Sequence, residues 1–152
     1  MEQTLATPAD AEIILKLYDL RREEVMRQAR AWLIGEFWPR TMEDYSAVAD
    51  NPAHPHNAHL RQVVSYWEMA AALALHGAVS AELFLDCNGE GLFILAKFAH
   101  ILEAIRAKNP TFMMKTSELI SRYSAASQRY EMTLRRAEGL RNRMAAVSSN
   151  AG

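Results

Sequence analysis

Apolar residues recur along this chain in steps of three, four or seven, the period of helices that bury one face. The first such stretch follows a helix-start signal at Thr7-Pro8 and stops before Pro39. Charged residues fill its opposite face. The pattern predicts one long amphipathic helix whose buried stripe holds Leu15, Tyr18, Val25, Ala29 and Trp32.

The middle of the chain predicts shorter helices around a central one. Thr41 and Ser80 are each expected to cap a short helix. Residues 50–57 hold two prolines and predict a loop. Asn57 is expected to cap a helix over 57–76. Beyond its middle this helix is apolar on nearly all sides, so we expect it to be the most buried one.

Two further helices are expected toward the C-terminus, over 90–108 and over 110–146. The second has apolar and small residues at alternating steps of three and four, the spacing of a coiled-coil seam. Its seam is mixed, so we expect the helix to pack on the first long helix as an antiparallel partner. The seam positions are Thr116, Leu119, Tyr123, Ala126, Tyr130, Thr133, Ala137, Leu140 and Met144.

These elements predict an all-α fold. We expect an antiparallel helical bundle of about four main helices, with short connecting helices and a long C-terminal helix. A chain of 152 residues fits one domain. We place that domain at residues 1–146 and expect the polar stretch 147–152 to be disordered.

Two neighbouring segments carry a resemblance. The first reads Ser65-Tyr66-Trp67-Glu68-Met69-Ala70-Ala71, and the second reads His76-Gly77-Ala78-Val79-Ser80-Ala81-Glu82-Leu83-Phe84. An aromatic-aromatic-Glu helix, a glycine stop and a capped second helix resemble uncharacterised bacterial all-helical domains of unknown function, over residues 57–108. The resemblance implies an all-α fold and transfers no catalytic residue.

Charge is distributed unevenly although the net charge is only −1. Residues 1–109 carry 10 Lys and Arg against 15 Asp and Glu, whereas residues 110–152 carry 7 against 3. This asymmetry favours docking of the basic C-terminal segment on the acidic body, or on an acidic partner. The single cysteine, the missing secretory signal and the missing membrane span lead us to expect a cytoplasmic protein.

Three histidines, His54, His56 and His59, lie within six residues, and imidazole nitrogen is a zinc ligand. A zinc site usually adds a ligand from a distant segment, so we regard them as exposed loop residues first and as metal ligands second. Glu-x-x-His motifs and glycine-rich phosphate loops are missing from the sequence. We therefore expect no cofactor and favour a protein that is not an enzyme.

Glu68 is the candidate of most interest because it lies on an otherwise apolar helix, on one side with Arg61, Ser65 and His76. Such a carboxylate either lines a pocket or is buried in an ion pair. Arg61, Arg21 and Arg22 are the expected partners for the ion pair. The sequence leaves both alternatives open.

The C-terminal helix carries arginines every seven residues beside its seam. Charges in this position flank a helix–helix interface more often than they bind nucleic acid. The candidate interface comprises Arg122, Tyr123, Arg129, Tyr130, Arg136, Leu140, Arg143 and Met144.

Three functions follow, in decreasing order of support. The first is a helical interaction or assembly domain that binds a protein partner or a second copy of itself through the C-terminal helix. The second is a small metal- or ligand-binding protein or enzyme, with its site around Glu68, His76 and the histidine loop. The third is nucleic-acid binding by the arginine stripe, which the slightly acidic net charge makes the weakest of the three.

Overall fold

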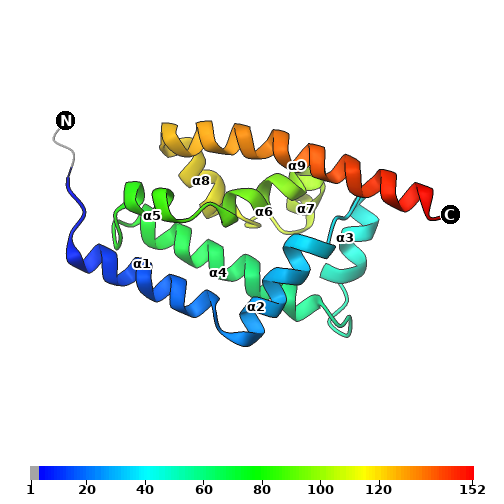
Figure 1. The fold of residues 1–152 in the computed structure, drawn as a ribbon, viewed down its shortest axis with the longest axis horizontal. Helices are drawn as coiled ribbons and strands as arrows, with labels where there is room; N and C mark the ends of the chain where they lie inside the picture. Colours follow the sequence, from blue (N-terminus) through cyan, green and yellow to red (C-terminus); the bar gives the residue numbers. More distant parts are fainter. Residues whose placement is uncertain (1–3) are drawn as a thin grey trace.

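A computed structural model of the chain describes residues 4–152, and all of their regular secondary structure is helical (Figure 1). The predicted all-α fold is therefore confirmed. The elements in chain order are α1 (Pro8–Arg21), α2 (Glu24–Ala31), the π-helical turn η1 (Trp32–Glu36), α3 (Met42–Ala49), α4 (Asn57–Leu75), α5 (Ala81–Cys87), α6 (Glu90–Phe98), the 3-10 turn η2 (Ala99–Ile101), α7 (Leu102–Lys108), α8 (Met114–Arg122) and α9 (Ser124–Asn150).

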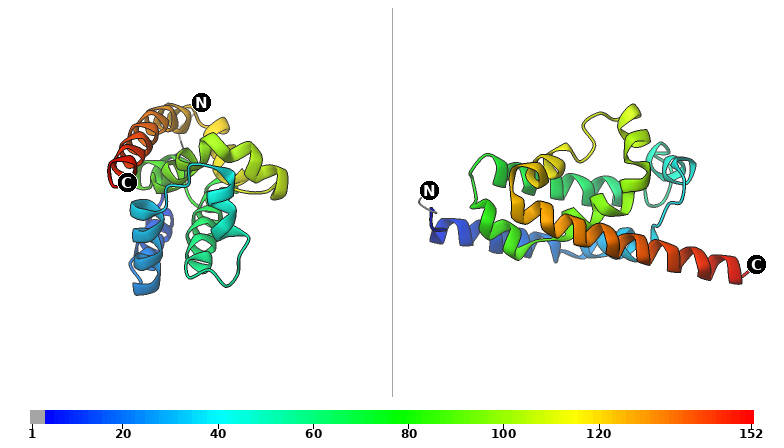
Figure 2. Two further views of the ribbon diagram at one scale, coloured as in Figure 1. Left: turned by 90° about the vertical axis from the view of Figure 1, so that its right-hand side faces the viewer. Right: turned by 90° about the horizontal axis from the view of Figure 1, so that it is seen from above.

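Helix α4 occupies the centre and packs against α2, α3, α6 and α8. Helix α1 lies along one side of α4 and runs in the opposite direction (Figure 1), with the Tyr66 hydroxyl donating to the Leu17 carbonyl between them. On the other side α9 runs along α6 and α8, as the end-on and top views show (Figure 2). Trp67 on α4 is 2% exposed, in keeping with the central position predicted for this helix.

The predicted helix starts at Thr7, Thr41 and Ser80 are confirmed. The Thr7 and Thr41 hydroxyls each accept a hydrogen bond from the backbone N–H three residues on. The acidic side chain at that position accepts the backbone N–H of the threonine, which completes a capping box. Ser80 accepts the N–H of Leu83. Local side-chain chemistry alone fixes these three boundaries.

Asn57 does not cap α4 as predicted. The cap position of α4 is His56, and Asn57 is the first helical residue. Its side chain is buried and donates to the carbonyls of Val48 (2.8 Å) and Ala49 (3.1 Å). Asn57 therefore closes the C-terminal end of α3, because those carbonyls have no helical partner of their own.

The first long helix of the prediction is divided. The Glu23 carboxylate accepts the N–H groups of Val25 and Met26, so it ends α1 and starts α2 as an N-cap. The predicted helix 90–108 is likewise split into α6, η2 and α7. Its break follows Ala96 and Lys97, whose carbonyls accept hydrogen bonds from the Arg141 guanidinium.

The last predicted helix is also two helices, separated by Tyr123 in an extended conformation. The prediction that it packs chiefly on the first long helix is wrong, because α9 packs on α6 and α8 while α4 and α5 take the inner side of α1. Helix α9 continues to Asn150, four residues past its expected end. In this last stretch the Ser148 and Ser149 hydroxyls donate to backbone carbonyls about one turn back.

None of the helices in the described part of the chain is both long and apolar enough to cross a membrane. The core instead gathers aromatic residues around the junction of α3, α6 and the 109–113 loop. Tyr45, Phe98 and Phe112 meet edge to face, with ring centroids 5.4 to 6.0 Å apart. This cluster forms the back of the groove described next.

Candidate functional site

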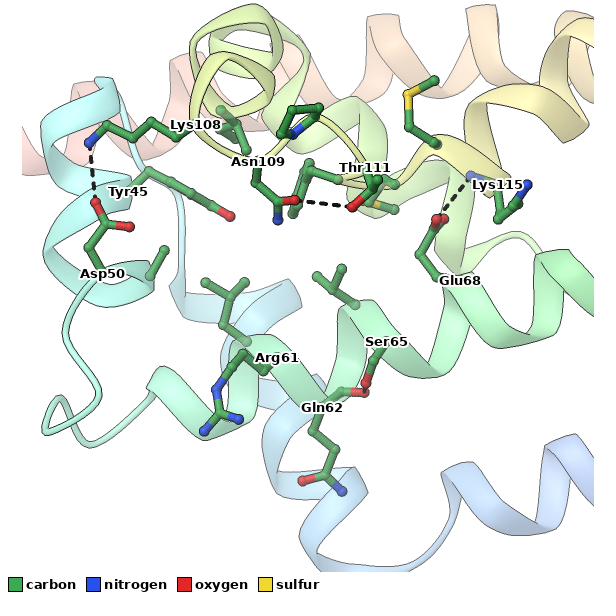
Figure 3. A pocket seen from close by; sticks show the side chains of 18 of the residues that line it. Tyr45, Asp50, Arg61, Gln62, Ser65, Glu68, Lys108, Asn109, Thr111 and Lys115 are labelled. Carbon is green, nitrogen blue, oxygen red and sulfur yellow. Dashed lines mark hydrogen bonds and ion pairs between the residues drawn. The ribbon is translucent and has the colours of Figure 1, made fainter.

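A groove opens between α3, α4, α7 and the loop that leads into α8 (Figure 3), with a volume of about 1240 Å³. Most of its lining is apolar. Helices α3 and α4 form two of its walls, and residues 109–113 form the third. The apolar lining residues are Met42, Tyr45, Ala49, Leu60, Val64, Ile105, Phe112, Met113 and Met114.

The loop wall is held by Arg106 on α7. Its guanidinium donates to the carbonyls of Phe112 (3.0 Å) and Met113 (3.2 Å) and to the hydroxyl of Ser117 (2.7 Å). Met113 is fully buried and has a left-handed backbone, with φ of 49°. That conformation costs a non-glycine residue about 1 kcal/mol. The bonds from Arg106 and the burial of Met113 hold the loop in this shape.

Glu68 holds the opposite end of the same wall. Its carboxylate accepts the N–H groups of Lys115 and Thr116, both at 2.9 Å, and the Thr116 hydroxyl at 2.6 Å. These N–H groups belong to the first turn of α8, which has no other cap. Glu68 therefore acts as the N-terminal cap of a helix 48 residues away, and the positive end of that helix stabilises its charge.

The structure brings three of the four candidates together, because Arg61, Ser65 and Glu68 all line the groove. Glu68 forms no ion pair with Arg61, Arg21 or Arg22 within residues 4–152. Arg61 instead donates to the Asn57 side chain (2.9 Å). Ser65 donates to the carbonyl one turn back, and His76 is exposed at the end of α4.

Tyr45 is a groove residue that the sequence analysis missed. Its ring belongs to the aromatic cluster, and its hydroxyl points toward the groove (Figure 3). No residue of the described chain hydrogen-bonds to this hydroxyl. Burial raises the Tyr45 pKa, and the nearby Asp50 carboxylate adds to the effect. The hydroxyl therefore stays protonated and offers a hydrogen-bond donor.

The charges at the two ends of the groove are already paired. Lys108 contacts Asp50 at 3.2 Å at one end, and Lys115 contacts Glu118 at 3.3 Å at the other. Both pairs are well exposed, so each contributes little to stability. Between them, Arg61 is a charged lining residue that has no carboxylate partner within residues 4–152.

The three candidate histidines lie together beside Trp32, apart from the groove. The Nδ1 atoms of His56 and His59 are 3.1 Å apart, and the His56 ring stacks on Trp32 with centroids 4.6 Å apart. His54 accepts the backbone N–H of His56. Within residues 4–152 no group of three or more His, Cys, Asp and Glu side chains is arranged to hold a metal ion.

The arginines of the C-terminal stripe are exposed, but three of them contact the body of the domain. Arg122 donates to the Leu75 carbonyl at the end of α4, and Arg129 to the Leu85 carbonyl in the last turns of α5. Arg136 lies over the Phe93 ring at 5.9 Å. Arg143 lies beyond these contacts and forms no ion pair within residues 4–152.

The seam beside that stripe is turned inward. Ala126 and Ala137 are fully buried, and Tyr123, Tyr130 and Leu140 are partly buried. Met144 is 39% exposed near the end of α9. The seam spacing therefore reports packing of this helix within the chain.

Lys97 is the second site residue that the sequence analysis missed. Its side chain is 1% exposed and donates to the carbonyls of Leu33 and Ile34 in η1, with Nζ 4.1 Å from the centre of the Trp38 ring. Burial, together with the charge of Arg141, lowers the Lys97 pKa to about 7. A lone lysine inside an apolar helix is the signal that could have revealed it.

Residues 6–123 match the model of a family described as a domain of unknown function, DUF4760. The match covers most of the chain, so the chain belongs to this family, and the resemblance to an uncharacterised domain is confirmed. In comparisons with curated proteins and with solved structures, nothing matches. The family match ends at Tyr123, the extended residue between α8 and α9, so α9 lies beyond it.

Proposed function

We propose that this member of the DUF4760 family is a non-enzymatic interaction domain whose groove binds an amphipathic helix of a partner protein. The observation that carries the proposal is the groove itself, which is apolar, large and open along one side. A helix that lays its apolar face in such a groove is a common mode of peptide recognition.

The size of the groove supports a helix over a small molecule. Small-molecule pockets occupy roughly 300–1,000 Å³, and this groove, at about 1240 Å³, is larger. Along α4 the lining runs from Ala58 to Glu68, which corresponds to about 15 Å of helix. A partner helix of about three turns fits this length, with apolar anchors at positions i, i+4 and i+7.

The polar groups of the groove define the partner further. Both ends carry charges that are already paired, so the inserted face needs no charge at its ends. The Tyr45 hydroxyl offers a donor toward the groove. We infer that the bound helix carries one acceptor, such as Asn, Gln or Ser, among its apolar anchors.

The commitments of the nearby side chains support a role other than catalysis. Both Glu68 oxygens accept hydrogen bonds from the start of α8, and Nε and Nη2 of Arg106 donate to the loop. Neither is left to transfer a proton or to hold a reacting group. We also propose a cytoplasmic location, because the single cysteine can form no disulfide within the chain.

The burial of the seam residues Ala126 and Ala137 leads us to place partner binding at the groove and not on α9. Self-association through the seam would need that face to be open. Nucleic-acid binding would need the arginines for phosphate contacts. Arg122 and Arg129 already donate to helix-end carbonyls of the same chain.

A pair of exposed methionines provides a matched test. Met114 lines the groove and is 43% exposed, whereas Met132 on α9 is 67% exposed and lies outside it. We would select binders for the whole protein from a displayed library of random 16-residue helical peptides. Fluorescence anisotropy would then measure their affinity for the wild-type protein, Met114→Glu and Met132→Glu.

We expect Met114→Glu to weaken binding at least tenfold and Met132→Glu to change it less than twofold. Tyr45→Phe should weaken binding threefold to tenfold by removing the donor of the Tyr45 hydroxyl. Selected peptides should share apolar residues at i, i+4 and i+7. The proposal is wrong if selection yields no helical binder, or if the binders respond equally to the two methionine variants.

A further inference from the structure

A second pocket, of about 600 Å³, lies between the segment 34–38, the turn before α6, and α9. It shares no lining residue with the groove. Two aromatic rings line it, Trp38 and Phe93, whose centroids are 6.1 Å apart at an interplanar angle of 76°. Lys97, on the same helix as Phe93, steadies the Trp38 ring through its ammonium group. The pocket therefore has a fixed aromatic corner.

Two arginines of α9, Arg129 and Arg136, enter this pocket. They are seven residues apart, so they lie on one face of the helix, about 10 Å from each other along its axis. Arg136 lies over the Phe93 ring, and Arg129 donates one N–H to the Leu85 carbonyl. Neither has a carboxylate within ion-pair distance in the described residues.

The only carboxylate of the pocket does not neutralise these arginines. Both oxygens of Glu90 accept from the Arg30 guanidinium at 2.8 Å, and one also accepts from the Trp67 indole N–H at 2.8 Å. Arg30 and Glu90 cancel each other, which leaves the two charges of α9 uncompensated. The pocket is therefore selective for an anion.

Gly89 shapes the pocket beside Arg129. A Cβ atom at this position would lie 2.5 Å from Nη2 of Arg129, closer than real contacts allow. The absence of a side chain at Gly89 leaves room for the Arg129 guanidinium beside the turn. That guanidinium has further N–H groups besides the one donated to Leu85.

We propose that this pocket binds a nucleoside monophosphate, with the base against Trp38 and Phe93 and the phosphate on Arg129 and Arg136. Arginine forks match phosphate oxygens, and nucleobases stack on aromatic side chains. The volume falls within the range of small-ligand pockets, about 300–1,000 Å³. This site is independent of the helix-binding groove.

The test uses the whole chain and six probes, the four ribonucleoside monophosphates, adenosine and ribose 5-phosphate. Isothermal titration calorimetry would measure each affinity, with NMR of the Trp38 indole N–H to locate binding. We expect at least one monophosphate to bind with Kd below 1 mM and to shift the Trp38 signal. Adenosine and ribose 5-phosphate should each bind at least tenfold more weakly than adenosine monophosphate, because each lacks one half of the recognised ligand.

Arg136→Gln should weaken binding at least tenfold. Its side chain is exposed and forms no ion pair within residues 4–152, so the variant should fold. Arg135→Gln is the matched control, because Arg135 is the exposed neighbour and does not line the pocket; its affinity should stay within twofold. The inference is overturned if no monophosphate binds below 1 mM, if Arg136→Gln and Arg135→Gln bind alike, or if Trp38 does not respond.

Discussion

The groove beside α4 and the face of α6 covered by α9 use charged side chains in different ways. Around the groove the ion pairs are exposed and sit at its two ends. Along α6 the charged groups are partly or fully buried: Glu90 is held by Arg30, and Lys97 and Arg141 donate to backbone carbonyls. Charged side chains thus lie at the edges of the groove, whereas on the α6 face they form buried contacts between elements.

The difference shows why only one of the two surfaces is left as a large apolar opening. On the α6 side, cationic side chains donate to carbonyls at helix ends that would otherwise be unpaired. These hydrogen bonds hold α9 against the rest of the domain. On the groove side, Glu68 and Arg106 form hydrogen bonds that hold the loop wall and the start of α8 in place, so the apolar side chains of the groove stay uncovered. The variants below test this contrast, starting with the largest expected effect.

Replacing Glu90 with Gln should cause the largest loss of stability. The change leaves the Arg30 guanidinium, only 24% exposed, without its negative partner. We expect the free energy of unfolding to fall by about 2–4 kcal/mol in urea denaturation. Glu131→Gln, an exposed change on α9, is the control and should cost less than about 0.5 kcal/mol. Equal losses in the two variants would remove the claimed contrast.

Lys97 should make the protein more stable as the pH rises from 7 to 9. In the unfolded chain its pKa is near 10.5, so it keeps a proton across this range, whereas the folded protein releases that proton above a pKa of about 7. The unfolded state then binds more protons, and stability rises with pH, by about 2 kcal/mol. Tyr45 and Tyr66, whose pKa values are raised by burial, oppose this only above about pH 10.

Urea denaturation at pH 7, 8 and 9 would measure this rise. Lys97→Met should abolish it, and Lys108→Met, which removes an exposed lysine, should leave it in place. A rise that persists in Lys97→Met would show that the buried charge is not its source.

The smallest of the three effects is expected at the groove. Glu68→Ala removes the cap of α8 and should lower the free energy of unfolding by about 1–2 kcal/mol. Hydrogen exchange at the Lys115 and Thr116 amides should accelerate at the same time, since both lose their acceptor. Glu103→Ala on α7 is the matched control. If the two amides exchange at unchanged rates, Glu68 is not the cap.

The sequence predicted the features that depend on neighbours in the chain. Thr7 and Thr41 find their partners three residues away, so their caps could be recognised without knowledge of the fold. Glu68 and Thr116 are 48 residues apart, and no local sequence pattern near either residue predicts the contact between them. The sequence could mark Glu68 as unusual, but not name what it binds.

The seam of the C-terminal region shows a similar limit. Its spacing continues from Thr116 to Met144 through the break at Tyr123, where neither glycine nor proline marks an end. The first part of the seam faces α4 and the second faces α6. Two different packing partners require the bend, and one uninterrupted period conceals it.

The contacts of helix α9 bear on where the C-terminal boundary of this domain lies. The family match stops at residue 123, yet Arg129 and Arg141 beyond it supply donors to carbonyls in the last turns of α5 and α6. A fragment ending at the family boundary would lose these donors and expose the apolar surface that Ala126 and Ala137 cover. We therefore expect the cooperative folding unit of this chain to extend past the family boundary and to include α9.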